Sequence, residues 1–416
     1  MLTAPSASPH AERFFYALMA LGGLVVLLGL GAAHHMEESG HIVTGMTNQI
    51  VWGLPHVFAI FMVVAASGVL NVASVGSVFG QAAYKPRAPL SALLCVALLA
   101  GGLMVLLLDL GRPERLIVAA THYNFKSMFA WNVILYSGMF AIVAVYLWTL
   151  LERRMNRHSK TVGIVALVWR FVLTTGTGSI FAFLVARQAY HSAVLAPLFI
   201  VLSLAWGLAV FLLVQAAVYA WNGQQLPALV RQRMARLLGI FVAAALYLVA
   251  VYHGTNLYFA HQTEFVAFIL LGRGDPGAVF AILFWTGYVA LGTLAPLALL
   301  FLPRCDSPRA TLAAAALVVA GAFAWLYVFI IGGQSFPLEI FPGYTASSSF
   351  ADGVVEPHLP RGPEWLLGLG GVGVAFLLTT LGVRLFDLLP RDDTKGTALA
   401  SPANDAAAGP AAKAAP

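Results

Sequence analysis

The sequence has little of what a soluble or metal-centred protein needs. Only 10 % of its 416 residues are charged, and 60 % are hydrophobic. It contains two cysteines, Cys95 and Cys305, and neither has a neighbour at the CxxC spacing. This spacing is typical of iron–sulfur clusters, zinc sites and redox motifs. We therefore predict no metal ligands, no iron–sulfur cluster and no disulfide framework within this chain.

Charge is scarcest in ten apolar runs of about 20 residues, the length that crosses a bilayer as a helix. The mean hydropathy of the chain is +0.85. We predict an all-α, polytopic integral membrane protein with about ten transmembrane helices, arranged as two four-helix groups plus two further C-terminal helices. The predicted spans are residues 13–34, 50–72, 88–109, 128–150, 162–188, 194–220, 235–258, 277–302, 310–332 and 364–388.

Basic residues mark every second loop between these runs, for example Arg153 and Arg154 in one loop and Arg231 and Arg233 in another. The intervening loops carry fewer. Basic loops stay in the cytoplasm, so both termini are expected there. The net charge of +6 therefore indicates topology and not nucleic-acid binding. We expect a multi-pass protein of the bacterial inner (cytoplasmic) membrane.

Composition divides the chain into one large membrane domain and two short ends. Residues 1–12 are expected to form a cytoplasmic N-terminus, and residues 13–388 the transmembrane helical domain. Residues 389–416 are rich in alanine and proline, which predicts a disordered cytoplasmic tail. Within the domain, residues 333–363 form a long outer loop rich in proline, glycine and aromatic residues. Such a loop suits a docking surface for a partner protein.

A charged stretch begins where the third apolar run ends. Asp109 closes that run at the edge of the hydrocarbon, and Arg112 follows one turn later. A carboxylate at this depth needs a partner, so we expect Asp109 and Arg112 to pair and hold the outer rim together. For Arg115 and Lys126 the alternative is simple anchoring to lipid headgroups.

Polar residues of several other runs lie at the same outer depth. Gln49, Trp52 and His56 have the spacing of one helix face. Amide, aromatic and histidine side chains at hydrocarbon depth suit a quinone, whose two carbonyls need donors and whose reduction needs a titratable group. The predicted proton-handling residues are His56, Asp109 and Arg112, and the predicted headgroup-binding residues are Asn48, Gln49, Trp52, His56, Asn132 and Tyr136, with no metal ligand.

Three segments of this outer region resemble one known family. Residues 48–56, 109–115 and 124–132 are similar to the NrfD/PsrC family, the membrane subunits of polysulfide reductase and related complexes. The aspartate–leucine–glycine–arginine–proline motif that starts at Asp109 is part of the match. Residues 178–191 and 334–344 extend it over most of the chain. The combination is most similar to the DsrP branch of the family.

The resemblance implies a quinone-interacting membrane subunit of a respiratory or sulfur-metabolism oxidoreductase complex. Such a subunit binds menaquinone or ubiquinone near the periplasmic face and carries no redox centre of its own. The resemblance also implies a periplasmic, ferredoxin-like iron–sulfur partner, with a multihaem cytochrome and other membrane subunits as further partners. The family's quinone site would map onto Asn48, Gln49, His56, Asp109 and Arg112 in this sequence.

Three other functions fit the same outer polar cluster. A secondary transporter could use it, although no pair of interrupted helices in matched halves is evident. A haem b cytochrome needs two histidines at matched depth, and His56 and His253 both lie near the outer ends of their runs. The third alternative is a structural anchor for periplasmic subunits.

Overall fold

The structure is a computed structural model that describes residues 9–221, 223–338, 353–386 and 388. Every regular element in these residues is helical. Within this described part, ten helical stretches are long and apolar enough to cross a membrane, which confirms the all-α polytopic class. The longer helices are α1 (Pro9–Ser39), α2 (Leu54–Val69), α4 (Ala88–Leu108), α6 (Met128–Leu151), α7 (Ser159–Ala182), α8 (Leu195–Trp221), α9 (Ala228–Tyr258), α13 (Pro308–Leu326) and α15 (Gly362–Leu385).

Shorter elements complete or connect these spans. The α-helical ones are α3 (Asn71–Ser77), α5 (Leu116–Thr121), α10 (Thr263–Leu271), α11 (Asp275–Ile282), α12 (Ala295–Phe301) and α14 (Gly333–Ser335). Short 3₁₀ turns are η1 (His41–Val43), η2 (Ala82–Arg87), η3 (Pro113–Arg115), η4 (Asn156–His158) and η6 (Pro303–Cys305). Two segments, η5 (Leu283–Leu294) and η7 (Tyr327–Gly332), are π-helical.

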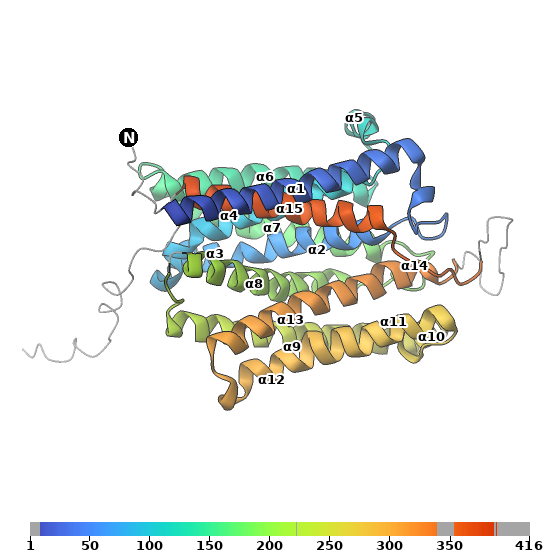
Figure 1. Ribbon diagram of the computed structural model, residues 1–416. Helices are drawn as coiled ribbons and strands as arrows, with labels where there is room; N and C mark the ends of the chain where they lie inside the picture. Colours follow the sequence, from blue (N-terminus) through green and yellow to red (C-terminus); the bar gives the residue numbers. More distant parts are fainter. Residues whose placement is uncertain (1–8, 222, 339–352, 387, 389–416) are drawn as a thin grey trace, which may run out of the picture.

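Eight of the spans form two groups of four. The first group contains α2, α4, α6 and α7, and the second contains α8, α9, the α11–η5–α12 span and α13. The groups meet where α8 packs against α2 and α7. The two remaining spans are α1 and α15, which lie side by side, and α15 packs against α4 and α2 (Figure 1). We expected two C-terminal helices outside the groups; instead, the first and last spans form this pair.

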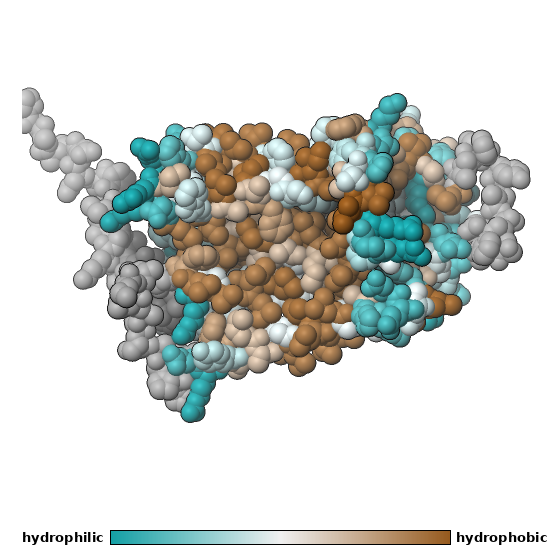
Figure 2. All heavy atoms as spheres, turned by 90° about the horizontal axis from the view of Figure 1, so that it is seen from above, coloured by the Kyte–Doolittle hydropathy of each residue, from teal (hydrophilic) through white to brown (hydrophobic). Residues whose placement is uncertain are grey.

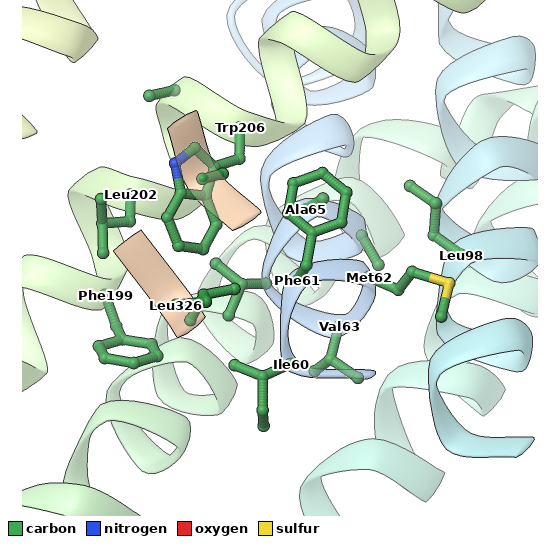
Figure 3. Packing of buried hydrophobic residues seen from close by; sticks show 14 of the residues in the cluster. Ile60, Phe61, Met62, Val63, Ala65, Leu98, Phe199, Leu202, Trp206 and Leu326 are labelled. Carbon is green, nitrogen blue, oxygen red and sulfur yellow. The ribbon is translucent and has the colours of Figure 1, made fainter. Parts of the chain in front are cut away.

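The contact between the groups depends on small residues. A Cβ atom added at Gly68 of α2 would overlap the backbone of Ser203 in α8, and one at Gly207 would overlap the backbone at Gly68. The helices can therefore approach closely enough for large rings to interlock beside the glycines. Figure 3 shows Phe61 of α2 next to Trp206 of α8, with ring centroids 5.9 Å apart. This buried seam fixes α2, the helix that leads to the candidate site.

The π-helical segments interrupt the eighth and ninth spans, and the sequence pattern did not predict them. η5 joins α11 to α12, and η7 follows α13 directly. A Cβ atom added at Gly292 of η5 would lie only 2.6 Å from the Cα atom of Gly321 in α13. The two spans thus touch backbone to backbone. π-helical turns are frequent at functional sites and shift the side chains that follow them.

The apolar surface forms a belt between two hydrophilic ends (Figure 2). We name them the basic end, where α1 begins, and the site end, where α2 and α15 begin. The basic end holds the loops that precede α4, α7, α9 and α13, in agreement with the predicted alternation. The site end holds η1, α5, α10 and α14. The predicted tail, residues 389–416, and residues 339–352 of the predicted outer loop lie outside the described residues.

Candidate functional site

The candidate site is built where the start of α2 meets the end of α4. These helices are antiparallel neighbours, so His56 in the first turn of α2 faces Asp109, the residue that ends α4. The Nδ1 atom of His56 lies 2.7 Å from the Oδ2 atom of Asp109. The Asp109 side chain is 1 % exposed and that of His56 is 16 % exposed. The pair therefore has a buried carboxylate and a ring that reaches the surface.

The expected pairing of Asp109 with Arg112 is wrong. Gly111 adopts a left-handed backbone conformation, with φ at 71°, and Pro113 then starts η3. These residues turn the chain away from α4, so Arg112 does not lie one helical turn above Asp109. Arg112 is exposed and forms no ion pair with any described residue. The structure gives Asp109 a histidine from another helix instead.

The contact between His56 and Asp109 is close but is not aligned as a hydrogen bond. Neither carboxylate oxygen of Asp109 accepts a hydrogen bond from a residue that the structure describes. A buried carboxylate without donors is costly, because burial removes its hydration. Asp109 therefore has unused acceptor capacity in the described structure.

Aromatic rings form one wall of this site. The Trp52 ring stacks on His56, with centroids 5.9 Å apart and planes inclined by 28°. Phe129, at the start of α6, lies 6.1 Å from Trp52 between ring centroids. Phe181 and Tyr190 contact the other side of Trp52. A flat apolar ligand could lie against such a surface and still reach the polar His56–Asp109 pair.

Residues 44–53, which we name the site loop, are not part of α2. The predicted span began at residue 50, but the helix begins at Leu54, with Gly53 before it and Pro55 in its first turn. Proline suits the first turn because its missing N–H is not needed there. Gln49 and Trp52 therefore do not share a helix face with His56, and that expectation is wrong.

Gln49 holds the site loop to other segments. Its side-chain amide donates to the carbonyl oxygens of Ser335, at 2.9 Å, and Val354, at 3.0 Å. Its side chain is thus engaged by backbone rather than directed at the His56–Asp109 pair. Asn48, its neighbour, is exposed. The structure brings His56, Asp109 and Trp52 together but not these two amides.

Gln334, at the end of the ninth span, binds the other half of the site loop. Its side-chain oxygen accepts hydrogen bonds from the backbone N–H groups of Val51, at 3.1 Å, and Trp52, at 3.0 Å. Its side-chain nitrogen donates to the carbonyl oxygen of Trp52, at 3.0 Å. One buried glutamine thereby fixes the backbone that carries the Trp52 ring. The predicted set of site residues did not include it.

Arg187 joins Gln49 and Gln334 in one network. Its guanidinium donates to the carbonyl oxygen of Gln49, at 2.7 Å, and to that of Gln334, at 3.0 Å. Burial lowers the pKa of Arg187 from its ordinary value, because the charged group has lost much of its hydration. This arginine was also missing from the predicted set. It supports the site loop from the segment after α7.

Glu364 fixes both ends of the site loop. Its carboxylate accepts hydrogen bonds from the N–H groups of Gly45, at 2.6 Å, and Leu54, at 3.0 Å. It also accepts one from the backbone N–H of Arg361, at 3.1 Å, and its Oε2 atom lies 3.2 Å from Nε2 of His358. One buried carboxylate thus caps the N-termini of α2 and α15 together. Sequence reasoning missed it, although Pro363 followed by a glutamate is a signal for the first turn of a helix.

Asn132 and Tyr136 lie in the contact between α6 and α7. The side-chain nitrogen of Asn132 donates to the carbonyl oxygens of Met128, at 2.9 Å, and Gly176, at 3.3 Å. Tyr136 is buried beside Thr177 of α7. Within the described residues, no hydrogen bond or ring contact joins either side chain to His56 or Asp109.

The two histidines considered for haem belong to different groups of helices. His56 contacts Trp52, whereas His253 of α9 contacts Tyr252, with ring centroids 4.8 Å apart. Tyr190 and Phe329 complete a series of ring contacts from Trp52 to Tyr252. A haem bridging the two histidines would have to displace these packed rings. The arrangement therefore gives no support to ligation by this pair.

Fold and site together define a multi-pass integral membrane protein with a close histidine–aspartate pair at one end of its helices. Residues 42–338 match the family described as "Polysulphide reductase, NrfD", and the chain belongs to this family. The predicted resemblance to the NrfD/PsrC family is thereby confirmed.

Three similar proteins belong to reductases and oxidoreductases of several subunits. The chain is 27 % identical to the Hdr-like menaquinol oxidoreductase integral membrane subunit of Archaeoglobus fulgidus, over 90 % of this chain and 94 % of that protein. It is 27 % identical to a putative dimethyl sulfoxide reductase membrane subunit of Halobacterium salinarum, over 88 % and 89 %. It is 21 % identical to a selenate reductase subunit of Mesobacillus selenatarsenatis, over 90 % and 94 %.

Proposed function

We propose that this protein is the quinone-interacting membrane subunit of an oxidoreductase complex, and that His56 and Asp109 form the reactive part of its quinone site. The contact of 2.7 Å between these side chains is the observation that carries the proposal. The relative from Archaeoglobus fulgidus is named as a subunit of a menaquinol oxidoreductase. Menaquinone or ubiquinone is therefore the proposed substrate.

The pair has the chemistry that this reaction needs. Oxidation of a quinol to a quinone releases two protons and two electrons, and reduction takes up the same number. Nδ1 of His56 faces Asp109, so the other ring nitrogen is the one that can exchange a proton with a quinone oxygen. The Asp109 carboxylate stabilises the imidazolium that forms when His56 takes the proton. Trp52 orients the imidazole by stacking on it.

A lipid-soluble substrate can reach the His56–Asp109 pair from the lipid-facing side of the molecule. Phe129, whose ring contacts Trp52, is 49 % exposed, and Leu110 next to Asp109 is 56 % exposed. Exposed apolar residues on a membrane-spanning protein face lipid. A quinone headgroup could thus enter between α4 and α6 while its isoprenoid tail stays in the bilayer. The partly exposed ring of His56 is the first titratable group on this route.

The electrons need an acceptor or donor outside this chain. We propose a ferredoxin-like iron–sulfur subunit on the site end, with a multihaem cytochrome and further membrane subunits in the same complex. The surface proposed for docking of this iron–sulfur subunit is the predicted outer loop. The clustering of basic loops at the opposite end supports a site end that faces the periplasm, in a bacterial inner membrane. The similarity to the polysulphide reductase family supports a role in sulfur metabolism.

The proposal is tested by replacing His56 in the assembled complex. His56→Ala and His56→Gln should each lower quinol-linked turnover by roughly 10²-fold, the usual contribution of a proton-transferring side chain. Both variants should insert into the membrane like the wild type. The matched control is His122→Ala, because His122 is exposed on the same end. Unchanged turnover and unchanged binding of a quinone analogue in the His56 variants would contradict the proposal.

A further inference from the structure

A second site of a different kind lies at the basic end, far along the helices from His56. A cleft of about 510 Å³ separates the first turns of α9 from α12 and the start of α13. This volume lies in the range of small-molecule sites. Its lining combines three arginines of α9 with leucine and phenylalanine side chains of α9 and α12. Nothing in the proposed quinone chemistry uses this cleft.

One of the three arginines is fully engaged within the protein. Arg231 forms an ion pair with Asp306, at 2.8 Å, and donates to the hydroxyl oxygen of Thr311, at 3.1 Å. Gln232 donates to the second carboxylate oxygen of Asp306, at 2.7 Å. These hydrogen bonds, of which the one from Arg231 has the larger effect, hold the pKa of Asp306 below its ordinary value. The carboxylate is therefore neutralised and both its oxygens are occupied.

The other two arginines have no such partner. Arg233 and Arg236 are exposed, line the cleft, and form no ion pair with any residue in the described part of the chain. They are three positions apart on α9, so they are neighbours on the helix surface. Two guanidinium groups side by side repel each other unless an anion lies between them. Arginine is also the side chain whose planar donors best match a phosphate group.

The rest of the cleft is apolar and open to lipid. Leu229, Phe301 and Leu302 are 53 %, 50 % and 55 % exposed. Phe301 lies so close to α9 that a Cβ atom added at Gly239 would be 2.5 Å from its ring. The glycine thus lets a large ring cover α9 just below the arginines. Charge at the membrane surface followed by apolar side chains towards the bilayer is the profile of a phospholipid.

We propose that this cleft binds an anionic phospholipid, with its phosphate between Arg233 and Arg236 and its acyl chains along Leu229 and Phe301. Basic clefts between helices at the cytoplasmic surface suit such headgroups, because anionic lipids are enriched in that leaflet. Arg231 and Asp306 line the cleft and neutralise each other in an ion pair. The net charge of the cleft therefore comes from Arg233 and Arg236 and is positive.

The experiment measures which lipid the full-length protein retains. Purified protein is equilibrated with vesicles of phosphatidylcholine and phosphatidylglycerol with identical chains, and bound lipid is counted by native mass spectrometry. The wild type should prefer phosphatidylglycerol. Arg233→Gln with Arg236→Gln should reduce that preference by on the order of tenfold, since each basic residue near the surface contributes to it. Arg233→Lys with Arg236→Lys should retain most of it.

The control removes the same charge from the same end but outside the cleft. Arg153 and Arg154 are exposed in the loop between α6 and α7, and Arg153→Gln with Arg154→Gln should leave the preference unchanged. An equal loss in this control, or no loss in the cleft variant, would show that only general surface charge acts and would overturn the proposal. Displacement of the bound lipid by millimolar inorganic phosphate would overturn it too, because the site would then recognise free phosphate.

Discussion

Asp109 is the residue that most constrains the chemistry of the site. Its side chain is buried, and among the described residues only the imidazole of His56 lies close enough to compensate its charge. Removal of one member of a buried ion pair usually costs about 3–5 kcal/mol, because the other charge is left without compensation. Asp109 and His56 are therefore expected to act as a unit, and changes at either position should not be additive.

A change of Asp109 to asparagine tests this unit. Asp109→Asn keeps the size of the side chain but removes the charge that stabilises a protonated His56. Quinol-linked turnover should fall roughly 10-fold to 100-fold, and combining the change with His56→Ala should add little.

Glu114→Gln is the matched control for Asp109→Asn. Glu114 lies in η3 and is exposed, so turnover should stay within about twofold of the wild type. Similar small effects of both changes would mean that Asp109 has no role in the reaction.

At the scale of elements, the site loop is the part of the molecule that the sequence described least well. A start of α2 at Leu54 was readable from Gly53 and Pro55, which are ordinary signals for a helix N-terminus. The hydrogen-bond partners of the site loop could not be predicted from the sequence. Gln49 bonds to Ser335, and Leu54 bonds to Glu364, at sequence separations of 286 and 310 residues. Periodicity and spacing describe neighbours along one helix and carry no information about such contacts.

Glu364→Gln should loosen the site loop. The amide nitrogen of a glutamine cannot accept from Gly45 or Leu54, so at least one buried N–H group loses its acceptor, at a cost of about 1–3 kcal/mol. We expect a lower melting temperature and faster hydrogen exchange across residues 44–54. Turnover should fall mainly through a raised KM for quinol, because Glu364 positions the loop without touching the His56–Asp109 pair.

Glu356→Gln provides the comparison for Glu364→Gln. Among the described residues the Glu356 side chain makes no hydrogen bond; only its backbone bonds to Ser335. Hydrogen exchange in the site loop should therefore match the wild type. Unchanged exchange in Glu364→Gln as well would show that the carboxylate does not hold the loop.

At the scale of the whole molecule, most of the architecture followed from the apolar runs. The number of spans and the two groups of four agree with the prediction, because a run of about 20 apolar residues has few alternatives in a bilayer. The pairing of α1 with α15 was not predicted. Consecutive helices tend to be neighbours, but this tendency does not say which distant spans meet. Gly29 and Gly370 touch each other in the contact between α1 and α15. Glycines are common in membrane helices, so these two did not identify the pair.

The orientation of the molecule can be tested by labelling. In a Cys305→Ser background, a cysteine at Glu264 of α10 should react with a membrane-impermeant maleimide on intact spheroplasts. A cysteine at Arg154 should react only after the membrane is opened. Both positions are exposed, one on each end. The expectation follows from the basic loops that cluster at one end, and the reverse labelling pattern would place the His56–Asp109 pair on the cytoplasmic side.

The contacts of the Glu364 carboxylate also determine when the site can assemble during biogenesis. It comes from the first turn of α15, yet it holds the backbone at Gly45 and Leu54, about 300 residues earlier in the sequence. Glu364 is therefore synthesised long after the segment that it holds has been inserted into the membrane. Until α15 enters the membrane beside α1, the start of α2 has no cap and the site loop lacks its anchor at both ends. A nascent chain thus completes its site only after α15 has been made, and a chain truncated before α15 would insert its earlier helices while its site stayed unassembled.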